Sequence, residues 1–118
     1  MGGGSMIRNR VVLVPFPFDD LSASKARPAV CLTESIGPHG HVILAFVTSK
    51  IPDDLLFSDI VLHSDSPEFT QTGLKVTSTI RLHRLLTVST DFVQRELGKL
   101  SAPTEQMIAE RLRRLFSL

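Results

Sequence analysis

Apolar residues occur in short, β-branched runs through the first half of the chain, and turn-forming residues separate these runs. The pattern predicts strands at about Arg10–Phe16, Pro28–Thr33 and His41–Thr48. Small and polar residues at Asp19–Ala26 predict a loop after the first strand. Because Gly37–Gly40 contains two glycines and a proline, it predicts a turn that joins the second and third strands in a hairpin.

The second half begins with weaker β signals. A short apolar run at Ile60–Leu62 predicts a fourth strand, and the polar segment Ser64–Lys75 predicts a loop with a single helical turn. Apolar and polar residues alternate over Val76–Leu82, which predicts a fifth strand. Successive side chains of a strand point to opposite faces, so three polar residues share one face of this strand and its end: Thr79, Arg81 and His83.

Toward the C-terminus the pattern becomes helical. Thr90–Leu97 predicts a short helix, because Gly98 after it is the residue favoured just beyond a helix end. Ser101 and Pro103 predict the start of a final helix, with a capping hydroxyl and an early proline. The apolar stripe of that helix comprises Ile108, Leu112, Leu115 and Phe116.

Five short strands in mostly antiparallel order, closed by a terminal helix, predict a mainly β protein with helices, built as a small β-barrel. The chain has 118 residues, of which 42% are hydrophobic and 21% charged, and these values are typical of one globular domain. We assign residues 6–118 to this domain and interpret residues 1–5, MGGGS, as a cloning remnant. Functional residues are expected in the loops at the mouth of the barrel.

Composition narrows the cellular context and the classes of partner. No apolar run approaches the ~20 residues of a membrane span, and no signal peptide is visible. The single cysteine, Cys31, excludes an internal disulfide and is typical of the reducing cytoplasm, where we expect the protein. The formal net charge is only +1, so nucleic-acid binding depends on how the basic residues cluster. The early cations, which include Lys25 and Arg27, would form a basic cleft if they meet those of the segment from Lys75 to Arg84.

Arg27 and two hydroxyls form the first candidate site. Arg27 and Pro28 stand directly before an apolar strand, and Thr48 and Ser49 end the strand to which the hairpin connects it. The two strand ends are therefore expected side by side, where a guanidinium fork and two hydroxyls can hold a phosphodiester. The alternative interpretation is structural: Arg27 forms an ion pair with Asp19 or Asp20 and Thr48 merely ends a strand.

Arg81 and His83 form the second candidate site, since a histidine can exchange a proton near neutral pH. The alternative is a solvated outer face of the strand. His39 and His41 have a spacing that could ligate a metal, but no third ligand follows nearby, so we expect no metal site.

Three sequence blocks resemble a known family: "VVLVPFPFDDLSASKARPAV", "ILAFVTSK" and "TGLKVTSTIRLHRL", followed by the closing helix. In this order they resemble the PemK/MazF toxins of bacterial toxin–antitoxin pairs, over about Val11–Leu118. The resemblance implies an SH3-like β-barrel that forms a homodimer. It also implies a metal-independent endoribonuclease without cofactors, which cuts single-stranded RNA or mRNA through attack of the substrate's own 2′-hydroxyl and leaves a 2′,3′-cyclic phosphate.

The resemblance also implies roles for individual residues. It places Arg27, Thr48 and Arg81 at the scissile phosphate, and His83 stands where some relatives have an acidic residue, so it would supply a different proton shuttle. The expected RNA-contacting residues are Lys25 and Lys50 on flanking phosphates, Ser49 and Thr79 beside the catalytic residues, and Phe18 and Phe57 for base stacking.

Two further expectations concern partners. A toxin of this kind needs an antitoxin, expected as an acidic, partly disordered segment that covers the basic mouth. Relatives with the same barrel inhibit growth by binding a topoisomerase, so a non-catalytic protein-binding toxin is the alternative function. In that case Arg113 and Arg114 of the last helix would form the functional surface.

Overall fold

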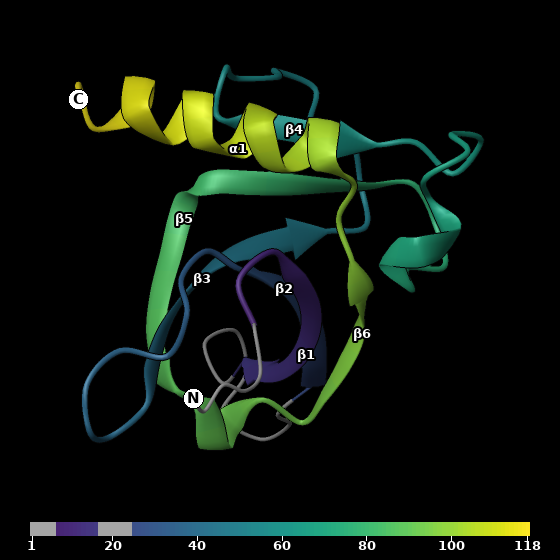
Figure 1. The fold of residues 1–118 in the computed structure, drawn as a ribbon. Helices are drawn as coiled ribbons and strands as arrows, with labels where there is room; N and C mark the ends of the chain where they lie inside the picture. The colour runs from purple at the N-terminus through teal and green to yellow at the C-terminus, as the bar shows by residue number, and fades with distance from the viewer. Residues whose placement is uncertain (1–6, 17–24) are drawn as a thin grey trace.

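Within residues 7–16 and 25–118, which the structure describes, a computed structural model shows six strands in one curled antiparallel sheet and one α-helix (Figure 1). The sheet is a half-barrel in the order β4-β5-β3-β2-β1-β6. The strands are β1 (Arg10–Phe16), β2 (Lys25–Cys31), β3 (His41–Thr48), β4 (Asp59–Leu62), β5 (Ser78–Ser89) and β6 (Arg95–Lys99), and α1 spans Ala102–Leu115. Two 3-10 turns, η1 (Thr70–Thr72) and η2 (Thr90–Phe92), lie before β5 and before β6. The prediction of a mainly β fold closed by a C-terminal helix is confirmed.

Alternating residues of the strands enter two hydrophobic clusters. In β1, Val11 belongs to one cluster, and Val12 and Val14 belong to the other. Helix α1 covers the first cluster, where Ile108 is 3% exposed. The predicted stripe of α1 is wrong at Phe116, which is 54% exposed, because this residue follows the last helical residue, Leu115.

Several predicted elements are confirmed. β1 and β3 have the predicted bounds, and β2 pairs with β3 in the predicted antiparallel hairpin. The hydroxyl of Ser101 accepts a hydrogen bond from the backbone N–H of Thr104 and so caps α1 as expected. The single helical turn expected between the fourth and fifth strands is η1.

Three predicted elements are corrected. β2 begins at Lys25 rather than Pro28 and ends at Cys31 rather than Thr33, because its pairing with β1 continues to Phe16↔Lys25. β5 begins at Ser78 and continues to Ser89, well past the predicted end at Leu82, because a second stretch of it pairs with β3.

The third correction concerns the helix predicted at Thr90–Leu97, which is wrong. The segment begins with the turn η2, and from Arg95 on it belongs to the edge strand β6, which pairs with β1 and adds a sixth strand. Gly98 does not end a helix: a Cβ built there would lie 2.1 Å from the carbonyl oxygen of Gln71. The glycine therefore permits close packing of β6 against η1.

β5 bends at the point where the register of its pairing with β3 shifts (Figure 1). Ala45 pairs with Leu85, whereas the next residue, Phe46, pairs with Arg81, so the three residues between, including His83, form an irregular bulge. Bulges of this kind bend a strand and re-aim its side chains. The bend gives the sheet its curl and places His83 at the corner.

Several sequence-based expectations fall outside the described residues. The proposed remnant 1–5, the greater part of the loop Asp19–Ala26, and Phe18 lie there. In the described part of the chain, no helix combines the length and the apolar character needed to cross a membrane.

Candidate functional site

A cavity of about 300 Å³ lies where β1, β2, β3 and β6 come together with the segment before β5. Three of its lining residues are paired in one row across the sheet: Leu13 of β1 pairs with Pro28 of β2 on one side and with Arg95 of β6 on the other. Arg27 stands next to Pro28 and also lines the cavity. The site is thus assembled mostly on strands, which hold their side chains in fixed positions.

The wall opposite β1 and β2 comes from two strand ends and one loop. Ser49 follows the last residue of β3, and Ser78 is the first residue of β5, so both serines reach the cavity from the same end of the sheet. Gly73 completes the wall in a left-handed conformation (φ 74°). A Cβ at this position would lie 2.0 Å from the carbonyl oxygen of Leu97, so only glycine allows the loop to close against β6.

The charge of this cavity is one-sided. Arg27, Lys75 and Arg95 line it, and none of the residues found in its lining is an aspartate or glutamate. None of these three cations forms an ion pair with another described residue. Like charges held together repel, and their repulsion is relieved when an anion enters. The arrangement is therefore suited to an anionic ligand.

Of the early and middle basic segments, whose meeting would form a basic cleft, Arg27 and Lys75 line this one cavity. Ser49, one of the two hydroxyls expected beside Arg27, also lines this cavity. The last pair between β2 and β3 at this end is Ala29↔Phe46. Arg27 lies two residues beyond this pair on β2, and Thr48, which is half-buried, lies two residues beyond it on β3. The two predicted residues therefore stand at the same open end of the hairpin.

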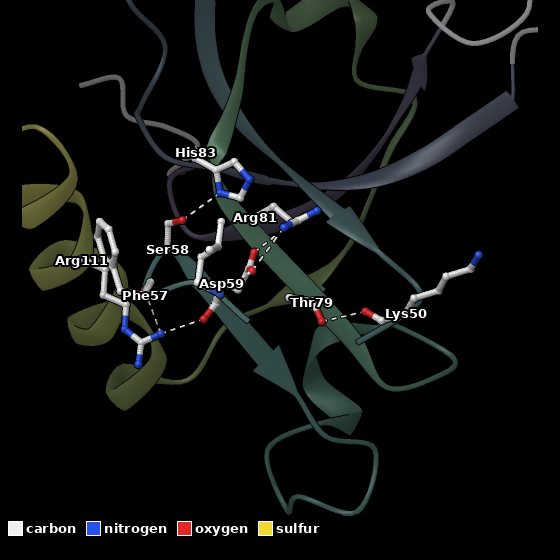
Figure 2. Close-up of polar contacts among 9 residues, drawn as sticks. Lys50, Phe57, Ser58, Asp59, Thr79, Arg81, His83 and Arg111 are labelled. Carbon is white, nitrogen blue, oxygen red and sulfur yellow. Dashed lines mark hydrogen bonds and ion pairs between the residues drawn. The ribbon is translucent and has the colours of Figure 1, made fainter. Parts of the chain in front are cut away.

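Arg81 does not join this cavity but forms an ion pair with Asp59 of β4 (Figure 2). Its Nε donates to Oδ1 of Asp59 at 2.9 Å, and Nη2 donates to Oδ2 at 3.3 Å. The Asp59 side chain is fully buried, whereas that of Arg81 is 24% exposed. Burial acts to raise the pKa of Asp59, but hydrogen bonds from Arg81 and Leu56 and the nearby positive charges outweigh it, so the pKa lies below its ordinary value.

His83 lies next to Arg81 along β5, and a serine holds its ring (Figure 2). The Ser58 hydroxyl and Nδ1 of His83 are 2.8 Å apart. Ser58 is buried and directly precedes Asp59, so two adjacent residues at the start of β4 hold the two predicted catalytic residues of β5. His83 itself is exposed, which leaves its other nitrogen accessible.

Helix α1 anchors the segment that carries this pair. Nη1 of Arg111 donates to the backbone carbonyls of Phe57 at 3.1 Å and of Asp59 at 2.8 Å (Figure 2). The guanidinium of Arg114 lies 4.2 Å from the centre of the Phe57 ring, a cation–π contact. Phe57, expected to stack on bases, is 37% exposed with Arg114 against its ring.

The remaining predicted residues take different positions. Lys25, Ser49 and Lys50 are exposed. Thr79 is fully buried and its hydroxyl donates to the carbonyl oxygen of Lys50 at 2.7 Å, so it can influence RNA only through the position of Lys50 (Figure 2). The acids proposed as partners of Arg27, Asp19 and Asp20, lie outside the described residues.

Sequence reasoning missed two groups of residues. Lys75 had been noted only as one basic residue among several, and Arg95 was hidden by the wrong helix prediction. Asp59 was missed because a single acid before a short strand carries no pattern, although its partner Arg81 had been singled out. Among the described residues, no group of three or more His, Cys, Asp or Glu side chains could hold a metal ion.

The model of the family described as "PemK-like, MazF-like toxin of type II toxin-antitoxin system" matches residues 7–116. A comparison with curated protein sequences finds no match.

Solved structures with the same fold include the toxin MazF-mt6 of Mycobacterium tuberculosis, with a TM-score of 0.70 and 22% identity over 92% of this chain and 97% of that one. An endoribonuclease from a mycobacterial species, solved in complex with its cognate antitoxin, has a TM-score of 0.69 and 13% identity over 97% of each chain. MazF of Deinococcus radiodurans has a TM-score of 0.67 and 13% identity over 98% of this chain and all of its own.

Proposed function

The chain belongs to the PemK-like, MazF-like toxins of type II toxin–antitoxin systems, and from this premise we propose that it is an endoribonuclease that cuts single-stranded RNA without a metal ion. The structural relatives named as endoribonucleases support the reaction class. The sequence that is cut is a separate property, set by the residues around the cavity.

One observation carries the proposal: Arg27, Lys75 and Arg95 line one cavity with hydroxyls beside them and without a carboxylate among the lining residues found. RNA is the polyanion that such a site would recognise through its phosphates. An arginine fixed on a strand meets a phosphate oxygen with little further loss of conformational freedom, which favours both binding and reaction.

The proposed chemistry uses the substrate's own nucleophile. The 2′-oxygen attacks the adjacent phosphorus and loses its proton, the bond from phosphorus to the 5′-oxygen breaks, and that oxygen takes up a proton. The products are a 2′,3′-cyclic phosphate and a 5′-hydroxyl, and no water is consumed. Arg27 would stabilise the negative charge that grows on the phosphate oxygens, with hydrogen bonds from Thr48 or Ser49 beside it.

Arg81 and His83 supply the second part of the proposal. Because Asp59 holds the Nε side of the Arg81 guanidinium, the remaining N–H groups are free to point toward a phosphate. In its doubly protonated form, His83 donates Nδ1–H to the Ser58 hydroxyl oxygen, and its Nε2 proton can be delivered to the leaving 5′-oxygen, which leaves a neutral ring. Lys25 and Lys50, both exposed, would bind flanking phosphates.

The proposal includes two partners. An acidic antitoxin segment would neutralise the toxin by covering the cationic cavity, and the complex formed by one structural relative supports this partnership. The family resemblance suggests a homodimer, which would place two such cavities in one particle.

Incubation of mixed-sequence single-stranded RNA with the protein in EDTA tests the function. We expect products that end in a 2′,3′-cyclic phosphate, and Arg27→Ala should lower the rate by ~10²–10³-fold. Arg113→Ala is the matched control, because Arg113 is exposed on α1 and far along the chain from the cavity-lining residues. If the wild type gives no cyclic-phosphate ends, or Arg27→Ala cuts as fast as Arg113→Ala, the proposal is wrong.

Arg27→Ala and a double replacement of Arg113 and Arg114 test the protein-binding alternative. In that case growth inhibition would survive Arg27→Ala and would be lost on replacement of Arg113 and Arg114. The contact of Arg114 with the Phe57 ring gives that arginine a role within the fold.

A further inference from the structure

The cationic cavity has two chemically different parts. Its charged lining residues, Arg27, Lys75 and Arg95, are all exposed, and we call them the rim. Five aliphatic lining residues, which we call the floor, are buried or half-buried, namely Leu13, Pro28, Val47, Leu74 and Leu97, whereas Val76 is exposed. A site for a phosphate alone would need only the rim, so the apolar floor calls for a ligand with an apolar body.

A nucleotide satisfies both parts. A fatty acid would use the floor but would leave most of the positive charge unpaired, and an inorganic phosphate would leave the floor empty. The volume of about 300 Å³ is at the lower end of the ~300–1,000 Å³ found for small-molecule sites, so the cavity accommodates one such unit rather than a folded element.

We propose that this cavity is a subsite for one unpaired nucleotide of the RNA, next to the phosphate held by Arg27, with Lys75 and Arg95 on the flanking phosphates and Ser78 reading the base. The inference rests on the proposed function for the identity of the strand that enters. It assigns roles to Ser78 and Arg95, for which the sequence had predicted none, and gives Lys75, until then only one cation of a possible basic cleft, a defined contact.

Ser78 would act toward a ligand as a hydrogen-bond acceptor and not as a donor. Its hydroxyl already donates to the carbonyl oxygen of Val76 at 2.8 Å, and its side chain lies in the cavity lining with the residue only 3% exposed. With its proton engaged, Oγ presents only lone pairs to a ligand. It therefore accepts from a base edge that carries an N–H group and discriminates against an edge that offers only acceptors.

The floor is aliphatic rather than aromatic, which affects how a base is held. No Phe is found among the lining residues, so the base would be held by burial against Leu and Val side chains and by its hydrogen-bonding edge instead of by ring stacking. Discrimination in this subsite should then depend strongly on Ser78.

A mixed-sequence single-stranded 2′-fluoro RNA lacks the 2′-hydroxyl nucleophile and cannot be cut by this reaction. Its binding therefore tests the phosphate contacts of the rim cations separately from cleavage. Three neutralised phosphates predict a slope of log affinity against log salt near −2, since each contributes ~0.7 on a single strand. Arg95→Gln should reduce the magnitude of the slope by ~0.7, and Lys75→Gln should do the same. Lys99→Gln is the matched control, because Lys99 is an exposed cation on the same strand, β6, and is not found in the cavity lining.

Equal slopes for Arg95→Gln and Lys99→Gln would overturn the assignment of the rim. This outcome is distinct from failure of the proposed function, which would appear as absent cleavage of ordinary RNA while the binding slopes keep the predicted pattern. Both cations are exposed, so the substitutions leave the folded core intact, and a thermal melt of each variant verifies this.

Mapping the ends of products from a randomised RNA tests the base-reading role. Ser78→Ala should relax the preference for one base at a single position beside the cut, by about tenfold, while cleavage of other positions keeps its selectivity. Ser66→Ala, which removes a half-buried hydroxyl outside this cavity, should leave the preference unchanged. An unaltered cleavage pattern for folded Ser78→Ala would show that Ser78 does not read a base.

Discussion

Asp59→Asn tests whether the ion pair between β4 and β5 stabilises the corner of the sheet. The change keeps the size of the side chain and an oxygen that can still accept the 3.0 Å hydrogen bond from the backbone N–H of Leu56. It removes the negative charge to which Arg81 donates twice. The experiment therefore isolates the charge of a fully buried carboxylate from its packing.

The expected loss follows from the burial of each partner. Breaking a fully buried ion pair typically costs ~3–5 kcal/mol, and a charge-assisted hydrogen bond contributes ~1.5–3 kcal/mol. Because the Arg81 side chain is 24% exposed, water can hydrate part of its guanidinium, and we take a value of about 2 kcal/mol. That is about a 30-fold change in the unfolding equilibrium, and for a chain of this size it lowers Tm by roughly 8 °C.

The lowered pKa of Asp59 determines how the stability difference between wild type and Asp59→Asn depends on pH. Its folded pKa lies below the ordinary value of aspartate, about 3.9, so the carboxylate's contribution is fully present above that value. The contribution is lost as the pH falls through the lower folded pKa, because both folded and unfolded states are then protonated. The stability difference between wild type and Asp59→Asn should thus be constant near neutral pH and should shrink in acid.

Urea unfolding, monitored by circular dichroism at neutral pH and at several acidic pH values, measures both quantities. Asp53→Asn is the matched control, since Asp53 is exposed before β4 and forms no ion pair with a described residue. The combination with Arg81→Gln then gives the coupling energy of the pair through a double-mutant cycle. Equal stability of Asp59→Asn and Asp53→Asn, or a difference that persists unchanged in acid, would refute the reasoning.

Three other predictions concern the fold. Gly98→Ala places a Cβ 2.1 Å from the backbone oxygen of Gln71, so it should lower the free energy of unfolding by ~1–3 kcal/mol, and an unchanged melting curve would contradict the packing argument. Burial, and then the charges of two glutamates, raises the pKa of Cys31 to about 12, so the native thiol should resist iodoacetamide at pH 8 and react only in urea; rapid native alkylation would exclude this. Arg111→Gln should speed amide exchange at the start of β4, where its two hydrogen bonds are lost, while Arg113→Gln should not; equal exchange in both would disprove the anchor.

The elements that the sequence predicted well are those in which local preference and tertiary packing agree. β1 and β3 are β-branched runs bounded by turn residues, and α1 has a serine cap and an early proline. Their bounds follow from residues close in sequence. The open end of the hairpin, with Arg27 opposite the end of β3, could be placed for the same reason.

The failures share a different cause. Residues 95–97, REL, favour a helix by intrinsic propensity, but pairing with β1 makes them a strand, and the partner lies about eighty residues earlier in the chain. β5 could not be followed past Leu82 because the bulge that contains His83 breaks the alternation. Asp59 likewise acquires its role only when β4 is placed beside β5.

The total charge of +1 hides how the basic side chains are used. Several contribute to the fold: Arg81 pairs with Asp59, Arg10 pairs with Glu96, and the guanidinium of Arg84 lies over the Phe46 ring. The rim cations Arg27, Lys75 and Arg95 have no acidic partner among the described residues. Mutual repulsion at such a rim lowers the stability of the folded chain, and an incoming polyanion removes this repulsion. Binding of RNA, or of an acidic antitoxin segment, should therefore raise Tm, and the increase should be smaller for Arg95→Gln than for Lys99→Gln, because only the first variant has already lost part of the repulsion.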